Sequence, residues 1–548
     1  MNLGNYLLFK NKFTFYCHLF KVIFITFIKR CIINMTTQTQ PNKKGFLNRV
    51  ERIGNIMPDV TMLFVYALII CWIFSFFLSF VHFDYFHPVT KEKIAVINMF
   101  QYEEIILFVT SAVKNFISFP PLGITIVATL GIGIAESSGF IKTALKKMLS
   151  FISPKMLTPT VVFVGIVAHL ASDSAYVILM PVSAMMFYAS GRHPLAGIAA
   201  SFAGLAGGFT ASYTPSIIDP IMQSFTQEAA QIMAPGYSVN VLCNYFFSVG
   251  GTFGVILTCW YITEKIVEPW LNKNCPISSG IDTKDAELGE ITPIEKRAFR
   301  FAGWAVVLMG IGLFALLLPE TSPLRSPEGS LTSPKAPIMQ IVVPLLFIFF
   351  SVPGLIYGYM TKSFASTKDI VKAMENITKS LIPFIVFAFF AAQFLYSFQH
   401  SNLGTLLALS GAELLRTLNM PSGMTVLGVI LLTAILNIMI TSATSKWAVI
   451  APVLVPMLMA VGISPELTQA AFRVSDSAMN VSTPMFPFYP LILMYCQKYY
   501  KGAGIGTLCS MMIPFTIGLL IVLTTTLFIF WGLDIPLGFD SGYTWQPA

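Results

Sequence analysis

The sequence is short of charge. Only 11% of its 548 residues are Asp, Glu, Lys or Arg and 55% are hydrophobic, with a mean hydropathy of +0.73. An average soluble domain has about 25% charged residues, so the shortage excludes an ordinary soluble protein. Several uncharged runs, most clearly residues 62–83, exceed the roughly 18 residues that identify a candidate spanning helix. Alternation over about ten residues, typical of membrane strands, is missing. We therefore predict an all-α polytopic membrane protein.

Motifs of other protein classes are also missing. The glycine-rich stretch 131–139 does not have the spacing of a phosphate-binding loop, and the sequence has no ATPase motif. The eight cysteines form no C-x-x-C pair, and most lie in apolar runs. His169 and His193 have no second ligand at a metal-binding spacing. We find no well-placed constellation for intramembrane catalysis, so we do not expect an enzyme.

The N-terminal residues before the first long apolar run consist of two segments. Residues 1–34 contain apolar runs too short to span a bilayer and no small-residue cleavage site, so we interpret them as an extension from a wrongly assigned start; a short amphipathic anchor is the alternative. Residues 35–57 are expected to form a basic cytoplasmic tail, because Lys and Arg flank spanning helices on the cytoplasmic side. The net charge of +8 follows the same loop pattern and does not indicate a nucleic-acid partner.

Polar segments suggest how the rest of the chain is organised. We expect a first transmembrane half at residues 58–263, a polar loop at 264–300 and a second half at 301–535. Residues 536–548 are expected to form a C-terminal tail. The segment 363–379 has the pattern of an amphipathic surface helix.

The two halves contain a repeat. Residues 172–200 align without gaps on residues 443–471. The matched positions include Pro181 with Pro452, Gly191 with Gly462, Pro194 with Pro465, and the aromatic pair Tyr176 and Trp447. Chance similarity between apolar stretches is the alternative, but shared prolines and a shared glycine make it less attractive.

Each copy of the repeat lies between two polar interruptions. A Ser/Thr-rich break precedes each copy, and a second break follows at 210–220 and at 479–488. Helices broken at matching places in two halves indicate the binding site of a secondary transporter, and favour alternating access over an open pore. Backbone unwound at membrane depth must face protein or a water-filled cavity. Its carbonyl oxygens suit a cation, and helix N-terminal amides suit an anionic group.

Charged and amide side chains collect at these breaks. A charge at the centre of a bilayer costs roughly 2.5–3.5 kcal/mol on insertion scales, so such residues are candidates for function. They are Asp173, Asp219, Asn437, Arg473, Asp476 and Asn480.

These candidates suggest definite roles. The Arg473 guanidinium suits a substrate carboxylate, and Asp476 suits a proton or Na⁺. The alternative is that Arg473 and Asp476, three residues apart, only neutralise each other on one helical face. The alternative for Asp219 is that it is a buried cap or turn residue before Pro220. Trp447 is expected either to pack in the core or to stack on an aromatic substrate.

At these residues the sequence resembles the aminobenzoyl-glutamate transporter (AbgT) family. The resemblance runs from about residue 48 to the C-terminus, and it is carried by stretches such as PPLGITIVATLGIGIAESSGFI, GRHPLAGIAASFAGLAGGF, SATSKWAVIAPVLVPMLM and AAFRVSDSAMNVSTPM. It implies a homodimer in the bacterial inner membrane. It also implies two structurally repeated halves with broken helices, two re-entrant hairpins and about nine spanning helices in each protomer.

The resemblance further implies a function and a site. It implies a cation-coupled secondary transporter that moves p-aminobenzoyl-glutamate or a related aromatic carboxylate; the alternative is proton-driven efflux of sulfonamide-type antimetabolites. No cofactor is expected apart from Na⁺ or H⁺ as coupling ion. The residues expected to bind substrate are Arg473, Trp447, Pro465, Thr444 and Asp219. Those expected to couple the cation are Asp476, Asp219, Asn480, Asp173 and Asn437.

Overall fold

The computed structural model describes residues 60–86, 91–149, 156–169, 174–278, 291–437, 440–483 and 486–546. Backbone contacts divide the chain into residues 1–52 and 53–548, and all described residues belong to the second unit. The described residues form helices, with two isolated β-bridges and no longer strand, which confirms the all-α prediction. The expectations for residues 1–34 and 35–57 lie outside the described residues.

Seven helical segments in the described part of the chain are long and apolar enough to cross a membrane. They also expose large apolar side chains, such as Phe314 at 64% and Ile521 at 61%, as a lipid-facing surface requires. The helices in these segments are α3 (Val60–Leu78), α4 (Tyr102–Ile117) with α5 (Pro120–Ser138), α11 (Tyr245–Ile262) with η3 (Thr263–Val267) and α12 (Glu268–Asn274), α13 (Pro293–Leu317), α15 (Val342–Thr361), α17 (Ile382–His400) and α23 (Ile505–Gly532).

Two sets of four short helices contain the repeat. The first set is α7 (Leu157–Ala168), α8 (Ser174–Ala189), α9 (Pro194–Gly207) and α10 (Ile218–Gln231), and the second is α19 (Ser422–Asn437), α20 (Ala443–Met459), α21 (Pro465–Met479) and α22 (Tyr489–Tyr499). Each helix is shorter than the roughly 20 residues needed to span a bilayer. The aligned repeat covers α8 and α9 in the first set and α20 and α21 in the second. The repeated unit is therefore larger than the aligned segment, and its short helices account for the expected broken helices and re-entrant hairpins.

The turns in the middle of the two sets have the same geometry. Gly191 and Gly462 adopt left-handed backbone, with φ of 71° and 89°. The amide after each glycine donates to the carbonyl five residues before it, at 2.8 Å and 3.0 Å, which is the Schellman pattern that ends a helix. Pro194 and Pro465 then occupy the first positions of α9 and α21, where a missing N–H costs nothing. The matched glycine and prolines of the sequence therefore specify one turn twice.

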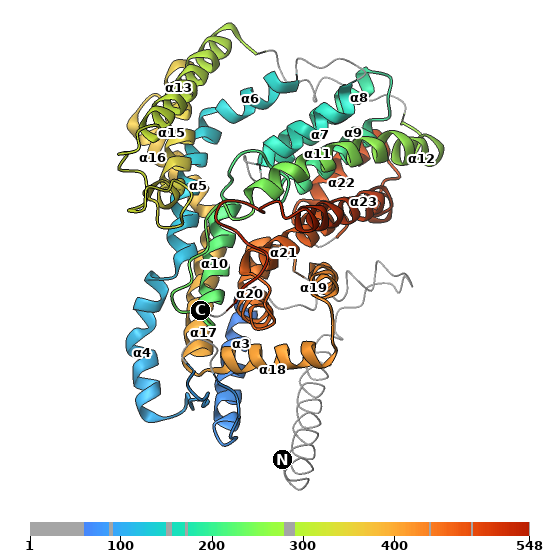
Figure 1. Ribbon diagram of the computed structural model, residues 1–548. Coiled ribbons are helices and arrows are strands. Elements are labelled where there is room, and N and C mark those ends of the chain that lie inside the picture. The colour runs from blue at the N-terminus through green and yellow to red at the C-terminus, as the bar shows by residue number, and fades with distance from the viewer. Residues whose placement is uncertain are drawn as a thin grey trace, which may run out of the picture. The chain divides into compact units, whose positions relative to one another are not determined.

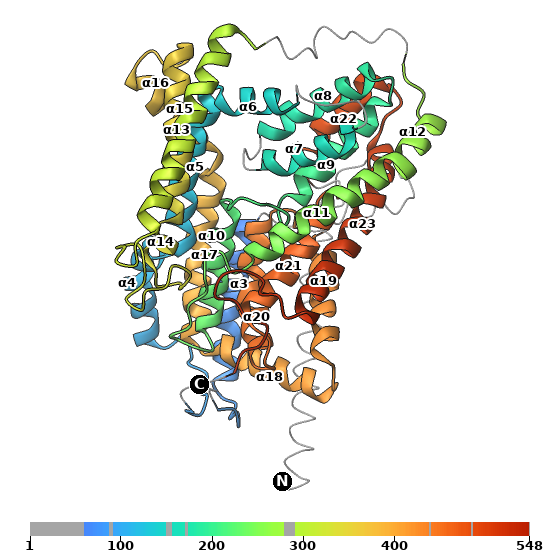
Figure 2. The same cartoon turned by 45° about the horizontal axis from the view of Figure 1, so that its top comes forward.

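The two sequence halves do not form two separate bodies within residues 53–548. Helix α5 packs on α15, α3 on α17, and α10 on α20, so helices from opposite halves are neighbours throughout. Figures 1 and 2 show α5, α13 and α15 side by side, and α7, α8, α9 and α11 grouped with α22 and α23. The remaining helices are α6 (Phe140–Leu149), α14 (Pro337–Gln340), α16 (Thr367–Ser380) and α18 (Leu403–Thr417).

Residues 279–290, the middle of the polar loop expected at 264–300, lie outside the described residues, and the parts on either side of them are mostly helical. Helix α11 continues through the π-turn η3 into α12 and ends at Asn274, and α13 begins at Pro293. A capping box starts α13, because Thr292 accepts from the Glu295 amide and Glu295 accepts from the Thr292 amide. The polar residues in the described parts of this segment therefore lie mostly at helix ends. The surface helix expected at 363–379 is present as α16.

Residues 536–546, the described part of the expected C-terminal tail, are packed against the rest of the protein. Leu537 is fully buried, and Tyr543 and Trp545 are only 8% and 9% exposed. The segment also lies along the α20–α21 turn, where Ser464 N donates to Tyr543 O at 3.1 Å and Trp545 N donates to Gly462 O at 2.9 Å. Three large side chains that bury apolar surface hold the segment in place.

Candidate functional site

Helix α21 is polar in sequence but lies in the protein interior. Every residue from Pro465 to Ala478 is buried, including one arginine, one aspartate and one glutamate. Helices α9, α10, α19, α20 and α23 pack around it, so none of these charges faces lipid. Buried charges at membrane depth are tolerated when they are paired or face a cavity. The expected site is therefore built around a single helix, and its chemistry depends on which partners the neighbours supply.

Arg473 pairs with Asp219 on α10. Its Nη1 donates to Asp219 Oδ1 at 2.6 Å, and its Nη2 donates to the Phe209 carbonyl at 2.8 Å. The buried Nε has no hydrogen-bond partner among the described residues. Asp219 Oδ2 accepts from the Ser216 amide at 2.8 Å, so Asp219 also holds the turn at the start of α10. Asp219 is therefore both a turn residue and the ion-pair partner of Arg473.

Asp476 pairs with Lys446 on α20. Lys446 Nζ donates to Asp476 Oδ1 at 2.6 Å, and the two side chains are 0% and 3% exposed. The second oxygen, Oδ2, accepts from Asn480 Nδ2 at 3.3 Å. Asn437 Nδ2 donates to Asn480 Oδ1 at 3.1 Å, while Asn437 Oδ1 is buried and has no partner among the described residues. Three of the expected cation-coupling residues, Asp476, Asn480 and Asn437, thus form one connected polar chain.

These pairings contradict the alternative in which Arg473 and Asp476 neutralise each other. Each has a separate partner on another helix, at 2.6 Å in both cases. Sequence reasoning missed Lys446. The signal was available, because Lys446 is the one charged residue of the apolar helix α20.

Trp447 lies fully buried between α10 and α21. Its Nε1 donates to Thr226 Oγ1 at 2.9 Å, and Thr226 in turn donates to Gln469 Oε1 at 2.7 Å. The indole stacks on Phe472, with ring centroids 4.5 Å apart and planes at 29°. One indole face is therefore covered by an aromatic ring of the protein itself.

The other expected residues are placed less centrally. Thr444 is in the first turn of α20 and partly buried, and Pro465 is the buried first residue of α21, near the turn and away from the charged pairs along the helix. Asp173 lies outside the described residues. The structure therefore joins Arg473 to Asp219, and Asp476 to Asn480 and Asn437, but assigns no contact between these groups and Thr444 or Pro465.

The polar break after α9 contacts the middle of α21. Thr210 Oγ1 donates to the Arg473 carbonyl at 2.6 Å and lies 2.5 Å from Ser477 Oγ. The carbonyl of Phe209, in the same break, accepts from Arg473 as described above. On the opposite side, Thr433 of α19 bonds Ser475 at 2.6 Å. Unwound backbone of the first half thus faces the charged helix of the second half, as expected for broken helices at a binding site.

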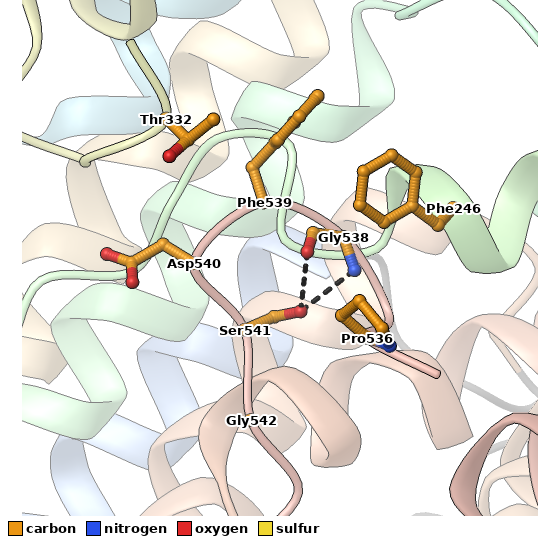
Figure 3. Close-up of a pocket in the computed structure, with 8 residues that line it drawn as sticks. All are labelled: Phe246, Thr332, Pro536, Gly538, Phe539, Asp540, Ser541 and Gly542. Carbon is orange, nitrogen blue, oxygen red and sulfur yellow. Dashed lines mark hydrogen bonds between the residues drawn. The ribbon is translucent and has the colours of Figure 1, made fainter. Parts of the chain in front are cut away.

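A surface pocket lies away from these residues. It has a volume of about 500 Å³ and is lined mainly by the C-terminal segment, including Phe539, Asp540 and Ser541 (Figure 3). None of the residues expected from the sequence lines it. The chemistry of Arg473 and Asp476 is the better guide to the site, because the described conformation encloses both side chains at 4% and 2% exposure.

Comparisons with known proteins agree with this architecture. The sequence model of the AbgT putative transporter family matches residues 45–545. The p-aminobenzoyl-glutamate transport protein of Escherichia coli (strain K12) is 31% identical over 489 residues, which cover 89% of this chain and 95% of that protein.

Two solved structures are similar along nearly the whole chain. The Alcanivorax borkumensis YdaH transporter, described as having an unusual topology, is 35% identical with a TM-score of 0.82, covering 88% of this chain and 100% of that one. Neisseria gonorrhoeae MtrF, described as illuminating a class of antimetabolite efflux pumps, is 36% identical with a TM-score of 0.84, covering 92% and 100%.

Proposed function

The chain belongs to the AbgT transporter family, and on that premise we propose that it is a cation-coupled secondary transporter of p-aminobenzoyl-glutamate or a related aromatic carboxylate. Its family and its structural relatives are transporters and not enzymes, so this chain is a multi-pass membrane transporter. The substrate is proposed from the Escherichia coli relative, whose substrate is in its name. The remaining support comes from the chemistry of α21.

The observation that carries the proposal is the buried pair of Arg473 and Asp219. A guanidinium at membrane depth needs an anion, and a substrate carboxylate has the same shape and charge as the Asp219 side chain. The two hydrogen bonds of Arg473 described above use two of the five N–H groups of its guanidinium, and the buried Nε–H is among those without a partner in the described residues. We propose that the substrate carboxylate binds Arg473 in exchange for Asp219. Asp219 is then free to bind a cation. It would thus take part in both substrate binding and cation coupling, the two roles expected from the sequence.

Asp476 is the proposed main cation site. A carboxylate and amide oxygens are the ligands that hard cations prefer, and Asp476, Asn480 and Asn437 are connected by hydrogen bonds. Na⁺ and H⁺ are both compatible with this set. We also assign Asp173 to cation coupling, because it lies in the Ser/Thr-rich break that precedes the first copy of the repeat.

The aromatic part of the substrate is assigned to Trp447. Stacking on the indole requires Phe472, which now covers one of its faces, to separate from it. Thr444 and Pro465 complete the proposed substrate residues. Thr444 lies at the N-terminus of α20, where backbone amides favour an anionic group.

A second candidate is proton-driven efflux of sulfonamide-type antimetabolites. It is favoured by the similarity to MtrF, which is described in connection with antimetabolite efflux pumps. Both candidates use the same residues and differ in substrate and direction. We further propose a homodimer in the bacterial inner membrane with a cytoplasmic N-terminus, from the family resemblance and from the basic residues before α3.

Counterflow in proteoliposomes tests the proposal. Vesicles loaded with unlabelled p-aminobenzoyl-glutamate should accumulate the labelled compound, and separately imposed Na⁺ and H⁺ gradients should show which ion accelerates net uptake. The same vesicles with a labelled sulfonamide separate the two candidates. No counterflow of either compound would contradict both.

A further inference from the structure

Lys446 occupies the position in which a coupling cation would meet Asp476. The ammonium is completely enclosed, its hydrogen bond to Asp476 Oδ1 is 2.6 Å long, and it lies 5.6 Å from the centroid of the Phe472 ring. A carboxylate oxygen that accepts so short a bond from an ammonium is not free to hold a second cation at the same time. Coupling through Asp476 therefore requires that Lys446 leave it.

The charges around this pair are few. Among the helices packed on α21, the described parts of α9, α19 and α23 have no charged residue. The charged residues of the other two, α10 and α20, and of α21 itself are Asp219, Glu228, Lys446, Glu466, Arg473 and Asp476. Arg473 is paired with Asp219, and Glu466 accepts from the Tyr237 hydroxyl at 3.0 Å. Lys446 is thus the residue placed to neutralise Asp476.

Two asparagines extend from the second oxygen of Asp476. Oδ2 accepts from Asn480 Nδ2, and Asn480 Oδ1 accepts from Asn437, whose buried Oδ1 has no partner among the described residues. An unpaired buried acceptor, joined to a carboxylate through one intervening amide, is a feature that a bound cation would satisfy. Lys446 approaches the first oxygen of Asp476 and the amides approach the second, so the two cations would compete for one carboxylate.

We propose that Lys446 is a tethered competitor of the coupling cation for Asp476. The inference rests on the proposed function. When the coupling cation binds, Lys446 leaves the carboxylate, and when the cation departs, Lys446 returns to it. The site is then electrically neutral without its cation. Because an unpaired carboxylate is costly at membrane depth, this neutrality lets the empty carrier change its orientation.

The proposal separates two kinds of transport. Counterflow uses only the loaded carrier, whereas net uptake also requires the empty carrier to return. Lys446→Met leaves Asp476 unpaired only when the cation has gone. We therefore expect the ratio of net uptake to counterflow to fall at least tenfold in Lys446→Met, while Lys446→Arg, which keeps the charge, stays within threefold of the wild type.

The double variant Lys446→Met/Asp476→Asn supplies the decisive comparison. It has no charge at the site in any state, so it should regain a wild-type ratio within threefold. It should also lose the acceleration of uptake by a cation gradient, measured once with a Na⁺ gradient at equal pH and once with a pH gradient without Na⁺. Asp476→Asn alone should also lose the acceleration of uptake by a cation gradient, because it removes the carboxylate for which Lys446 and the coupling cation compete.

Each outcome decides the proposal. It is overturned when net uptake and counterflow fall by the same factor in Lys446→Met, when neither changes, or when the double variant keeps its response to a cation gradient. The response of the double variant to a cation gradient decides the proposal even if Lys446→Met alone does not accumulate in the membrane. Absence of counterflow by the wild type contradicts the proposed function itself, whereas an unchanged ratio contradicts only the role of Lys446.

Discussion

Arg473 and Asp219, 254 residues apart in the chain, form a buried ion pair with a distance of 2.6 Å from Nη1 to Oδ1. The pair joins α21 of the second repeat to α10 of the first. Any relative movement of these helices must exchange the pair for another partner, because an unpaired buried charge is costly. The substrate carboxylate is the partner that the proposed function supplies.

Arg473→Ala is expected to lower p-aminobenzoyl-glutamate uptake by roughly tenfold to a hundredfold, since hydrogen bonds to charged groups contribute about 1.5–3 kcal/mol. Uptake of the labelled compound into proteoliposomes measures this. Arg300→Ala, which removes an exposed arginine from α13, is the control and should transport normally. Normal uptake by Arg473→Ala would remove Arg473 from the proposed site.

The same pair predicts a stability pattern. Arg473→Ala leaves Asp219 unpaired and should lower the free energy of unfolding by about 3–5 kcal/mol, whereas Arg473→Ala/Asp219→Ala should recover most of it without recovering transport. Thermal unfolding in detergent can be followed with a thiol-reactive dye, because the six cysteines in the described residues are free and buried. A double variant as unstable as the single one would show that the loss comes from packing.

Trp447 is fully buried, so its truncation should affect both stability and substrate choice. Trp447→Ala should cost about 3–5 kcal/mol of stability, as for other buried aromatic residues, and should reduce transport of aromatic carboxylates more than that of aliphatic dicarboxylates. Trp447→Phe keeps an aromatic ring against Phe472 and loses the bond to Thr226, so it should keep the preference for aromatic substrates. Equal loss for both substrate classes in Trp447→Ala would count against stacking.

Gly462→Ala should destabilise the α20–α21 turn. The added Cβ has room, with the nearest atom at 3.7 Å, so the cost is the left-handed backbone at φ of 89°, about 1–2 kcal/mol. Gly428→Ala in α19 is the matched control. It has no atom within 4 Å of the added Cβ and an ordinary helical backbone, so it should be neutral or stabilising. Unfolding temperatures in the reverse order would exclude backbone strain as the reason for glycine at this turn.

Trp545→Ala should lower the unfolding temperature, because Trp545 is buried against the α20–α21 turn. The expected loss is about 3–5 kcal/mol. Thr544→Ala, the neighbouring exposed position, should behave as the wild type. If both variants have the same unfolding temperature as the wild type, the C-terminal segment does not stabilise the turn.

Some features followed from the sequence because they depend on local composition. The scarcity of charge required a membrane protein, since no soluble fold buries so many apolar residues with so little polar surface. The shared glycine and prolines of the repeat specified the turns at Gly191 and Gly462, because left-handed backbone and a helix start are properties of a few consecutive residues. Polar residues in apolar runs identified Arg473, Asp476 and Asp219 for the same reason.

The partners of those residues were decided by tertiary structure. Three residues of spacing made Arg473 and Asp476 a plausible local pair, yet each is held by another helix: Arg473 by α10, 254 residues away, and Asp476 by Lys446 of α20, 30 residues away. The burial of residues 536–546 likewise depends on a surface formed by residues far away in the chain. A sequence shows which residues are too polar for lipid, but which charge neutralises which is fixed only when packing brings distant helices together. The site of this protein is therefore determined in its members by the sequence and in its pairings by the fold.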